Sequence, residues 1–212
     1  MEINELIICP NCKNNLQIKD GKYLCIDCNS TFDNVSAIPV LILHQTSIED
    51  ISQKHLAEYF DSKYKKDEDP WNYESSAAEK MKYEFVTSLV KELNPNIQTV
   101  LDVACSFGYL SNKLSNICEN VIGIDVSLNA LMKANEKYRK KNITFISAGA
   151  ENIPLKDKSF DAVILCDGLN GMDLTGIHRD NAVKESLRVL KDNGFTIFTD
   201  NLKPNQFESY IE

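Results

Sequence analysis

The amino-acid sequence predicts an α/β protein, a doubly wound Rossmann-like parallel sheet preceded by a small β ribbon. From residue 96 on, nearly continuous apolar segments alternate with helical ones, which is typical of parallel strands covered on both faces. Before residue 44, two Cys-x-x-Cys pairs stand among short apolar runs without helical periodicity. The 212 residues leave room for one medium domain and a small attachment. We therefore expect a ribbon over residues 1–43, a helical linker or lid over 44–95, and the α/β core over 96–212.

The linker should hold two helices. Apolar residues recur every three to five positions between residues 48 and 69, which predicts the first helix. Ser76 and Glu79 have the spacing of a capping box at the start of a second helix, which Pro95 ends. The core segments then alternate in the order TVLDVAC strand, GYLSNKLSNI helix, NVIGIDV strand, LNALMKANEKYRKK helix, ITFISA strand, FDAVILC strand, DNAVKESLRVL helix and GFTIFTD strand.

Charge and apolar runs narrow the class of protein. The formal net charge is −8, so no basic field draws a polyanion to the surface, and nucleic acid is the poorer expectation. The N-terminus is acidic where a secretory signal would be basic, and no apolar run approaches the roughly 20 residues that span a bilayer. Seven cysteines, an odd number, argue against a fold held by disulfides alone. We expect a soluble cytoplasmic protein without a membrane partner.

Four of the cysteines form a predicted metal site. Cys9 and Cys12 make one pair, twelve residues separate it from the pair Cys25 and Cys28, and a β hairpin can bring the two turns together. Four thiolates in a tetrahedral array suit zinc, and a closed ligand shell is structural rather than catalytic. Two redox pairs are the alternative, although a thioredoxin-type pair would follow a strand and open a long helix. If the metal is zinc, chelation should unfold this segment and spare the rest.

A second candidate site follows the first core strand. The run VLDVACSFGYL over residues 100–110 predicts a buried strand, a turn of small residues and a helix start, where the backbone can approach a ligand closely. It lacks the GxGxxG pattern, so a dinucleotide fits poorly. Asp125 ends the next strand, where its carboxylate can accept both ribose hydroxyls of an adenosine-type ligand. The alternative is that Asp125 only caps the following helix ahead of Ser127.

These motifs resemble the class I S-adenosylmethionine-dependent methyltransferases over about residues 97–199. VLDVACSFGYLS resembles the first motif of that family, VLDxGCGxGxxS, and VIGIDVS resembles the second. SAGAENIPLKDKSFDAVIL resembles the adenine-side motif with the fourth strand, and ESLRVLKDNGFTIF the segment usually written ExxRVLKPGG. CPNC, CIDC, TF and IPVLIL are similar to the zinc ribbons that precede some methyltransferases. The ribosomal RNA guanine methyltransferases with such a ribbon usually have a His ligand, which this chain lacks.

The resemblance implies S-adenosylmethionine as cofactor and assigns the positions that bind it. Those positions are Asp102, Ala104, Ser106, Gly108, Asp125, Val126, Ala150, Glu151 and Cys166. Ala104 and Ser106 replace two glycines of the family's first loop, which leaves Gly108 to allow close approach to the methionine part of the cofactor. Gly149 stands where many members have an Asp that contacts the adenine amine, so adenine recognition would fall to the Ala150 amide and nearby apolar walls.

Two further segments supply candidates near the substrate. Residues 67–83, DEDPWNYESSAAEKMKY, resemble a stretch in methyltransferases related to the nodulation S family, which N-methylate an amino sugar. That resemblance implies that Trp71 and Tyr73 lie over the mouth of the cofactor and substrate site; the alternative is that this aromatic pair pins two helices together. If the acceptor is an amine or a hydroxyl, Asp167 is the first candidate to take its proton and His178 the second.

The favoured function is a methyltransferase with a structural zinc ribbon that acts on an N or O atom of a small molecule or saccharide. An RNA-modifying methyltransferase that docks through the ribbon is one alternative; a non-catalytic, truncated cofactor-binding or interaction module is another. The family core has seven strands, whereas this sequence reaches the fifth at Thr199, so we expect the last two to be lacking and a partner or second copy to cover the open sheet edge. The only dense basic run is Lys137, Arg139, Lys140 and Lys141, which a helix C-terminus explains without RNA.

Overall fold

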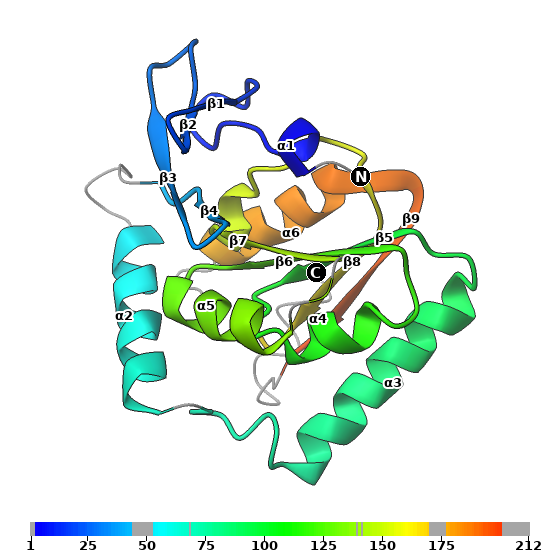
Figure 1. Cartoon of the computed structure of the whole chain (residues 1–212). Helices are drawn as coiled ribbons and strands as arrows, with labels where there is room; N and C mark the ends of the chain where they lie inside the picture. The colour runs from blue at the N-terminus through cyan, green and yellow to red at the C-terminus, as the bar shows by residue number, and fades with distance from the viewer. Residues whose placement is uncertain are drawn as a thin grey trace.

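A mixed sheet that is mostly parallel in its core runs through the middle of the protein (Figure 1). The computed structural model describes residues 3–43, 53–67, 69–138, 140, 142–169 and 177–200. In these residues the strand order is β1-β2-β3-β4-β7-β6-β5-β8-β9. The strands are β1 (Gln17–Lys19), β2 (Lys22–Leu24), β3 (Thr31–Val35), β4 (Ile38–Val40), β5 (Thr99–Val103), β6 (Asn120–Asp125), β7 (Ile143–Ser147), β8 (Phe160–Cys166) and β9 (Leu190–Thr199). The pairings among β1 to β4 are antiparallel, and those from β4 to β9 are parallel.

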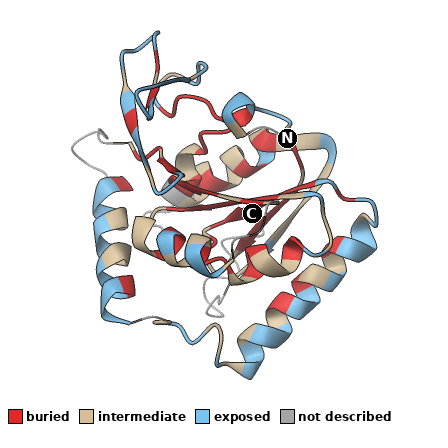
Figure 2. Cartoon of the chain, in the orientation of Figure 1, coloured by how far each residue is buried: buried red, intermediate tan, exposed pale blue. Residues whose placement is uncertain are grey.

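Helices cover both faces of the parallel strands, as the alternating sequence predicts. The helices α3 (Ala77–Leu93), α4 (Tyr109–Leu114) and α5 (Leu128–Lys137) pack on one face, and α6 (Ile177–Val189) packs on the other (Figure 1). The other helices in the described residues are α1 (Ile3–Leu6), α2 (Gln53–Lys66) and the 3-10 turn η1 (Ala150–Asn152). Every residue of β5 is buried, and the central strands form the buried layer in Figure 2. A strand without a solvent-facing side explains why its sequence is apolar throughout.

The two helices expected before the core are present. The Ser76 hydroxyl caps α3 by accepting a hydrogen bond from the Glu79 N–H at 3.4 Å, and α3 ends at Leu93, two residues before Pro95. A polar oxygen at this position satisfies one of the N–H groups that the first helical turn leaves unpaired. Helix α2 occupies residues 53–66 of the expected 48–69; residues 48–52 and 68 lie outside the described part.

The strands of the ribbon belong to the same sheet as the core strands. Strand β4 pairs in parallel with β7 at Val40 and Ser147, and the Leu41 N–H donates to the Ser147 carbonyl at 2.7 Å. On the same side, the Ile8 N–H donates to the Pro154 carbonyl at 3.0 Å. Most buried residues of the ribbon share one apolar cluster with the core strands and α6, whereas Ile38 belongs to the cluster on the opposite face of the sheet. The ribbon therefore extends the sheet edge beside β7.

Candidate functional site

A cavity of about 480 Å³ lies at the carboxyl ends of β5, β6 and β8, a size and place typical of ligand sites in doubly wound folds. Sequence-predicted residues form much of its lining: Trp71, Tyr73, Ala104, Ser106, Asp125, Val126, Ala150, Glu151, Cys166 and Asp167. The rest of the lining is Leu56, Phe60, Tyr64, Glu79, Ala148, Gly168 and Asp200. The candidates from three motifs and the segment before the core thus meet around one space.

Asp125 presents a polar carboxylate to this cavity. The Ser106 N–H donates to one of its oxygens at 2.9 Å, and the Ser127 N–H donates to the other at 2.8 Å. Burial raises the pKa of Asp125 to about 6; these two hydrogen bonds hold it down, and nearby Asp61 raises it. Each oxygen keeps lone pairs for further hydroxyl donors. Helix α5 is capped by Ser127, whose hydroxyl accepts from the Ala130 N–H at 3.2 Å, so the capping alternative for Asp125 is wrong.

The turn after β5 keeps a glycine-like backbone without two of the glycines. Ala104 has φ 58° and Ser106 has φ 53°, both in the left-handed region that costs a residue with a side chain about 1–2 kcal/mol. The surrounding contacts enforce this shape: Ser106 gives its N–H to Asp125, and its hydroxyl hydrogen-bonds the hydroxyl of Tyr64. The turn can therefore bring its backbone to the cavity although the sequence lacks the usual glycines.

Gly108 and Asp102 lie behind the turn, outside the lining of the large cavity. A Cβ on Gly108 would come within 2.8 Å of the Phe145 ring, and its φ of 77° also favours glycine, so packing and backbone geometry require this residue. Asp102 accepts a hydrogen bond from the Ser111 hydroxyl at 2.5 Å and lines a second, smaller cavity. Burial raises the pKa of Asp102 to about 7.

Helix α2 and the segment after it form the other side of the cavity. Leu56, Phe60 and Tyr64 lie four residues apart, so one face of α2 presents all three. The Trp71 ring lies 5.3 Å from Tyr64 and 6.1 Å from Tyr73, measured between centroids. The pair of Trp71 and Tyr73 both lines the cavity and joins α2 to α3, so each sequence interpretation describes part of its geometry. The helical period of α2 was visible in the sequence, but nothing there showed which face met a ligand site.

Gln53, at the start of α2, lies over Gly149, which stands between the lining residues Ala148 and Ala150. It is only 1% exposed; its Oε1 accepts from the Leu43 N–H at 2.9 Å, while its buried Nε2 has no hydrogen-bond partner among the described residues. A Cβ on Gly149 would lie 2.5 Å from that Nε2 and 2.7 Å from a carboxylate oxygen of Glu151. The Gln53 amide therefore fills the space that a side chain at residue 149 would need. Sequence reasoning missed Gln53, which comes from a distant segment.

Asp167 is held at the cavity by a cation that the sequence analysis missed. Lys82 of α3 forms ion pairs with the carboxylates of Asp167 and, at 2.6 Å, of Glu79. Burial by itself would lower the pKa of Lys82, but hydrogen bonds to the two carboxylates outweigh it and raise that pKa. Both carboxylates line the cavity. The side chain of the second candidate base, His178, lies outside the described part of the structure.

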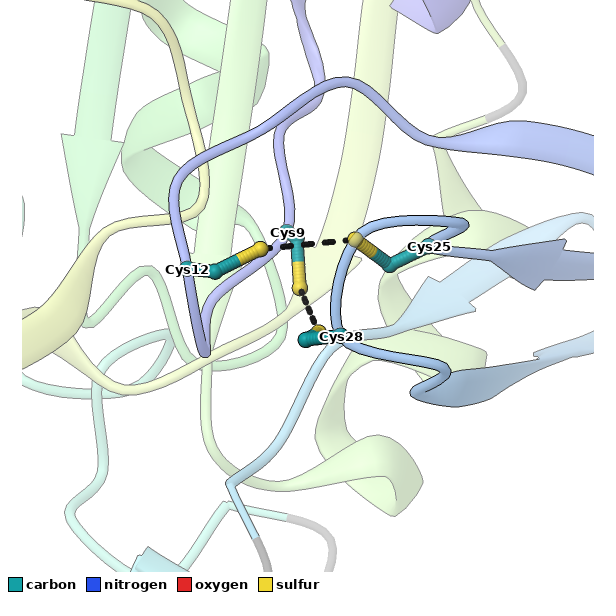
Figure 3. A group of neighbouring side chains, drawn as sticks. All are labelled: Cys9, Cys12, Cys25 and Cys28. Atoms are coloured by element: carbon teal, nitrogen blue, oxygen red, sulfur yellow. Dashed lines mark hydrogen bonds between the residues drawn. The ribbon is translucent and has the colours of Figure 1, made fainter.

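The four cysteines of the ribbon come together as predicted. Their sulfur atoms all lie within 4.8 Å of one another (Figure 3). The Sγ atoms of Cys9 and Cys28 are 3.6 Å apart, and those of Cys12 and Cys25 are 3.4 Å apart. Four sulfurs at about 2.3 Å from a central zinc would be separated by about 3.8 Å, so the cluster fits a tetrahedral ion after small movements. The donor set of four thiolates is typical of a structural zinc site.

Two other sequence features have structural explanations. Burial raises the pKa of the Cys166 thiol to about 12, which favours a packing role over a nucleophile. In the basic run, Lys137 pairs with Glu74, and the Lys140 ammonium donates to Ser115 and Asn116 at 3.0 and 2.9 Å. Arg139 and Lys141 lie outside the described residues. The described lysines of this run therefore make ion pairs or hydrogen bonds with other residues of the same chain.

Sequence comparisons find similar proteins for the α/β part of the chain. A family model described as a methyltransferase domain matches residues 101–198, from β5 to β9. The ubiquinone/menaquinone biosynthesis C-methyltransferase UbiE of Pseudomonas aeruginosa is 31% identical over 113 residues, covering 50% of this chain and 43% of the relative. Its counterpart in Erwinia tasmaniensis is 32% identical over 118 residues, covering 52% and 45%. The chain thus spans less than half the length of these curated relatives.

Structure comparisons extend the likeness beyond the core. The PH0226 protein of Pyrococcus horikoshii is 31% identical, with a TM-score of 0.55 over 73% of this chain and 68% of that one. The N-methyltransferase NodS of Bradyrhizobium japonicum, solved in complex with S-adenosylhomocysteine, has a TM-score of 0.60 at 19% identity, over 67% of this chain and 71% of that one. At that identity the second likeness concerns the fold. Among the described helices, none has the length and apolar character that crossing a bilayer requires.

Proposed function

We propose that this chain, whose residues 101–198 match a methyltransferase domain, transfers a methyl group from S-adenosylmethionine to an N or O atom of a small molecule or saccharide. The observation that best supports this proposal is the buried Asp125 carboxylate, which faces the cavity from the end of β6 next to the left-handed turn at Ala104 and Ser106. In this proposal residues 1–43 form the structural zinc ribbon, 44–95 the lid, and 96–212 the cofactor-binding core.

The residues of the cavity suit the parts of that cofactor. Asp125 would accept the ribose hydroxyls, Val126 and Ala150 would flank the adenine, and the backbone of Ala104 and Ser106 would approach the methionine part. When bound, S-adenosylmethionine supplies a methyl group on a positively charged sulfur, which is already a strong electrophile. The protein then mainly has to orient the acceptor, an effect that can contribute about 7–11 kcal/mol. The faces of Trp71 and Tyr73 would favour a nearby cation.

The acceptor part of the proposal depends on the carboxylates of Asp167 and Glu79. Both line the cavity, and Lys82 holds them in place. An amine or hydroxyl acceptor has a proton to lose, and a positioned carboxylate can take it. The curated relatives are named as C-methyltransferases and NodS as an N-methyltransferase, so the names of similar proteins do not agree on the acceptor atom.

Binding of S-adenosylhomocysteine tests the proposal. A concentration about 100-fold above Kd should stabilise the protein by roughly 2.7 kcal/mol, which a rise in melting temperature detects. Asp125→Ala should abolish the rise. The matched control, Asp192→Ala, removes an exposed carboxylate that pairs with Lys158 on the surface and should keep it. No rise in the wild-type protein at millimolar ligand would overturn the proposal.

The acceptor atom is tested with S-adenosylmethionine labelled on the methyl group and a panel of amino sugars, phenols and quinols. Transfer to N or O should occur, and Asp167→Asn should lower turnover by about 10²-fold while leaving the affinity for S-adenosylhomocysteine within twofold. Transfer to carbon alone would overturn the acceptor assignment and leave methyl transfer itself in place.

A further inference from the structure

The turn of the first cysteine pair lies against the loop that follows β7. We call residues 9–13, from Cys9 to Lys13, the knuckle. The Lys13 ammonium donates hydrogen bonds to the side-chain oxygen of Asn152, to the Ile153 carbonyl at 3.3 Å and to Glu185 at 3.0 Å. In the reverse direction, the Asn152 amide donates to the Pro10 carbonyl at 2.9 Å. Both segments therefore supply a donor side chain, Lys13 in the knuckle and Asn152 in the loop, to the hydrogen bonds that join them.

The loop held in this way is a wall of the large cavity. Asn152 is the last residue of η1, and the two residues before it, Ala150 and Glu151, line the cavity. Ile153 is fully buried, so the loop is fixed on its other side by the core. A shift of Asn152 moves its covalent neighbours, since η1 is a single turn of three residues.

The metal site fixes the knuckle. Lys13 directly follows Cys12 and has φ 62°, and its N–H donates to the Cys9 carbonyl at 2.8 Å. The knuckle meets the opposite turn through the sulfurs of Cys25 and Cys28, 3.4 and 3.6 Å from their partners. A zinc ion would join the two turns by four strong bonds. Without it, those thiols would have only weak contacts, and the left-handed conformation of Lys13 would lose its main constraint.

We propose that Lys13 and Asn152 are positioning residues through which the zinc site orders the Ala150–Asn152 wall, so that zinc retention and cofactor binding strengthen each other. This inference rests on the proposed function, because it takes the cavity to be the cofactor site. Binding equilibria coupled in this way are reciprocal: the factor by which zinc tightens the cofactor equals the factor by which the cofactor tightens zinc.

A second anchor of the same loop limits the size of the effect. Arg188 of α6 donates to the Ile153 carbonyl at 2.7 Å and to the Leu155 carbonyl at 2.9 Å. These bonds do not involve the ribbon and would persist when zinc leaves. We therefore expect a coupling of about fivefold, at the lower end of the usual range, rather than an all-or-none switch.

The experiment measures effects that cross between the two sites. The Kd of S-adenosylhomocysteine is measured by calorimetry on zinc-loaded wild type, Lys13→Met and Asn152→Ala, and the Kd of zinc by competition with a chromophoric chelator, with and without saturating S-adenosylhomocysteine. Lys13→Met on the ribbon side should raise the Kd of S-adenosylhomocysteine about fivefold. Asn152→Ala on the cavity side should raise the Kd of zinc by a similar factor.

Matched controls separate this coupling from general destabilisation. Lys22→Met removes a ribbon lysine that pairs with Asp33 on the surface, and Asn96→Ala changes an exposed asparagine after α3; both should leave the two constants within twofold. In wild type, saturating S-adenosylhomocysteine should lower the Kd of zinc about fivefold. Unchanged constants in folded Lys13→Met and Asn152→Ala would overturn the inference. Absence of S-adenosylhomocysteine binding by zinc-loaded wild type would overturn the proposed function instead.

Discussion

The cysteine cluster and the strand-end cavity are assembled in opposite ways. Each cysteine pair comes from one tight turn, and the residue type alone specifies its chemistry, since few groups other than metals gather four thiolates. The cavity collects residues from α2, α3, the ends of four strands and the loop around η1, and most of its lining residues are chemically ordinary. A local ligand set can be recognised from spacing, whereas a cavity depends on which distant surfaces pack together.

The largest expected effect separates the two regions by removing a zinc ligand. Cys25 is fully buried, and Cys25→Ser should reduce bound zinc to near zero and destabilise the ribbon by at least about 3 kcal/mol, because structural zinc stabilises a small fold strongly. Elemental analysis and hydrogen exchange check this: protection should be lost over residues 5–40 and kept in β5, β6 and β8. Cys118→Ser, where the hydroxyl can replace the thiol's bond to the Leu114 carbonyl, is the control. Full zinc content in Cys25→Ser would contradict the assignment.

A smaller effect concerns the cavity wall. Gly149→Asp places a side chain where the Gln53 amide lies, and this overpacking should lower the free energy of unfolding by about 1–3 kcal/mol and weaken S-adenosylhomocysteine binding. Gln53→Ala in the same chain should recover part of both losses, as urea unfolding and calorimetry would show. Gly21→Asp adds the same side chain with open space around it but at φ 76°, so it should cost about 1–2 kcal/mol in backbone strain and leave S-adenosylhomocysteine binding unchanged. A Gly149→Asp protein as stable as wild type would show that Gln53 leaves this space easily.

The last expected effect is a pH dependence with opposite signs for stability and binding. Burial raises the pKa of Asp102 to about 7 and that of Asp125 to about 6, both above the value for an unfolded aspartate. Near these pH values the folded state therefore binds protons that the unfolded state has released. The stability that these protons contribute is lost as the pH rises through 6 and 7. Lowering the pH from 7.5 to 5.5 should raise the free energy of unfolding by about 2–3 kcal/mol, most of it from Asp102.

Cofactor affinity should move the other way, because the ribose hydroxyls need an ionised Asp125. Near pH 5.5 only about a quarter of a carboxyl with this pKa is ionised, so the affinity for S-adenosylhomocysteine should fall about fourfold from pH 7.5. Urea unfolding and calorimetry at the two pH values measure both slopes. Asp125→Asn, which does not titrate, should remove the pH dependence of binding. Affinity that rises on acidification would contradict the role of Asp125.

The sequence predicted the elements well because their signals are local. The capping box at Ser76, the apolar strands and the two cysteine pairs all depend on neighbours within one element, and the structure confirms them. The positions of Gly108 and Asp102 were harder to predict from the sequence. Their family motif places them near the cofactor, whereas packing against Phe145 and a hydrogen bond from Ser111 hold them behind the turn. Lys82 and Asp167 are 85 residues apart in the sequence, so no local pattern predicted their ion pair.

By itself, the sequence determined the α/β class, the metal ligand set and the strand ends that carry Asp125 and Asp167, because apolar periodicity and residue chemistry act over a few positions. Only the tertiary structure decided that the ribbon joins the sheet at β7, that Gln53 fills the space above Gly149 and that Lys13 reaches Asn152. Such contacts depend on the packing of segments far apart in the chain, and hydrogen-bond geometry appears only once the backbone has brought them together.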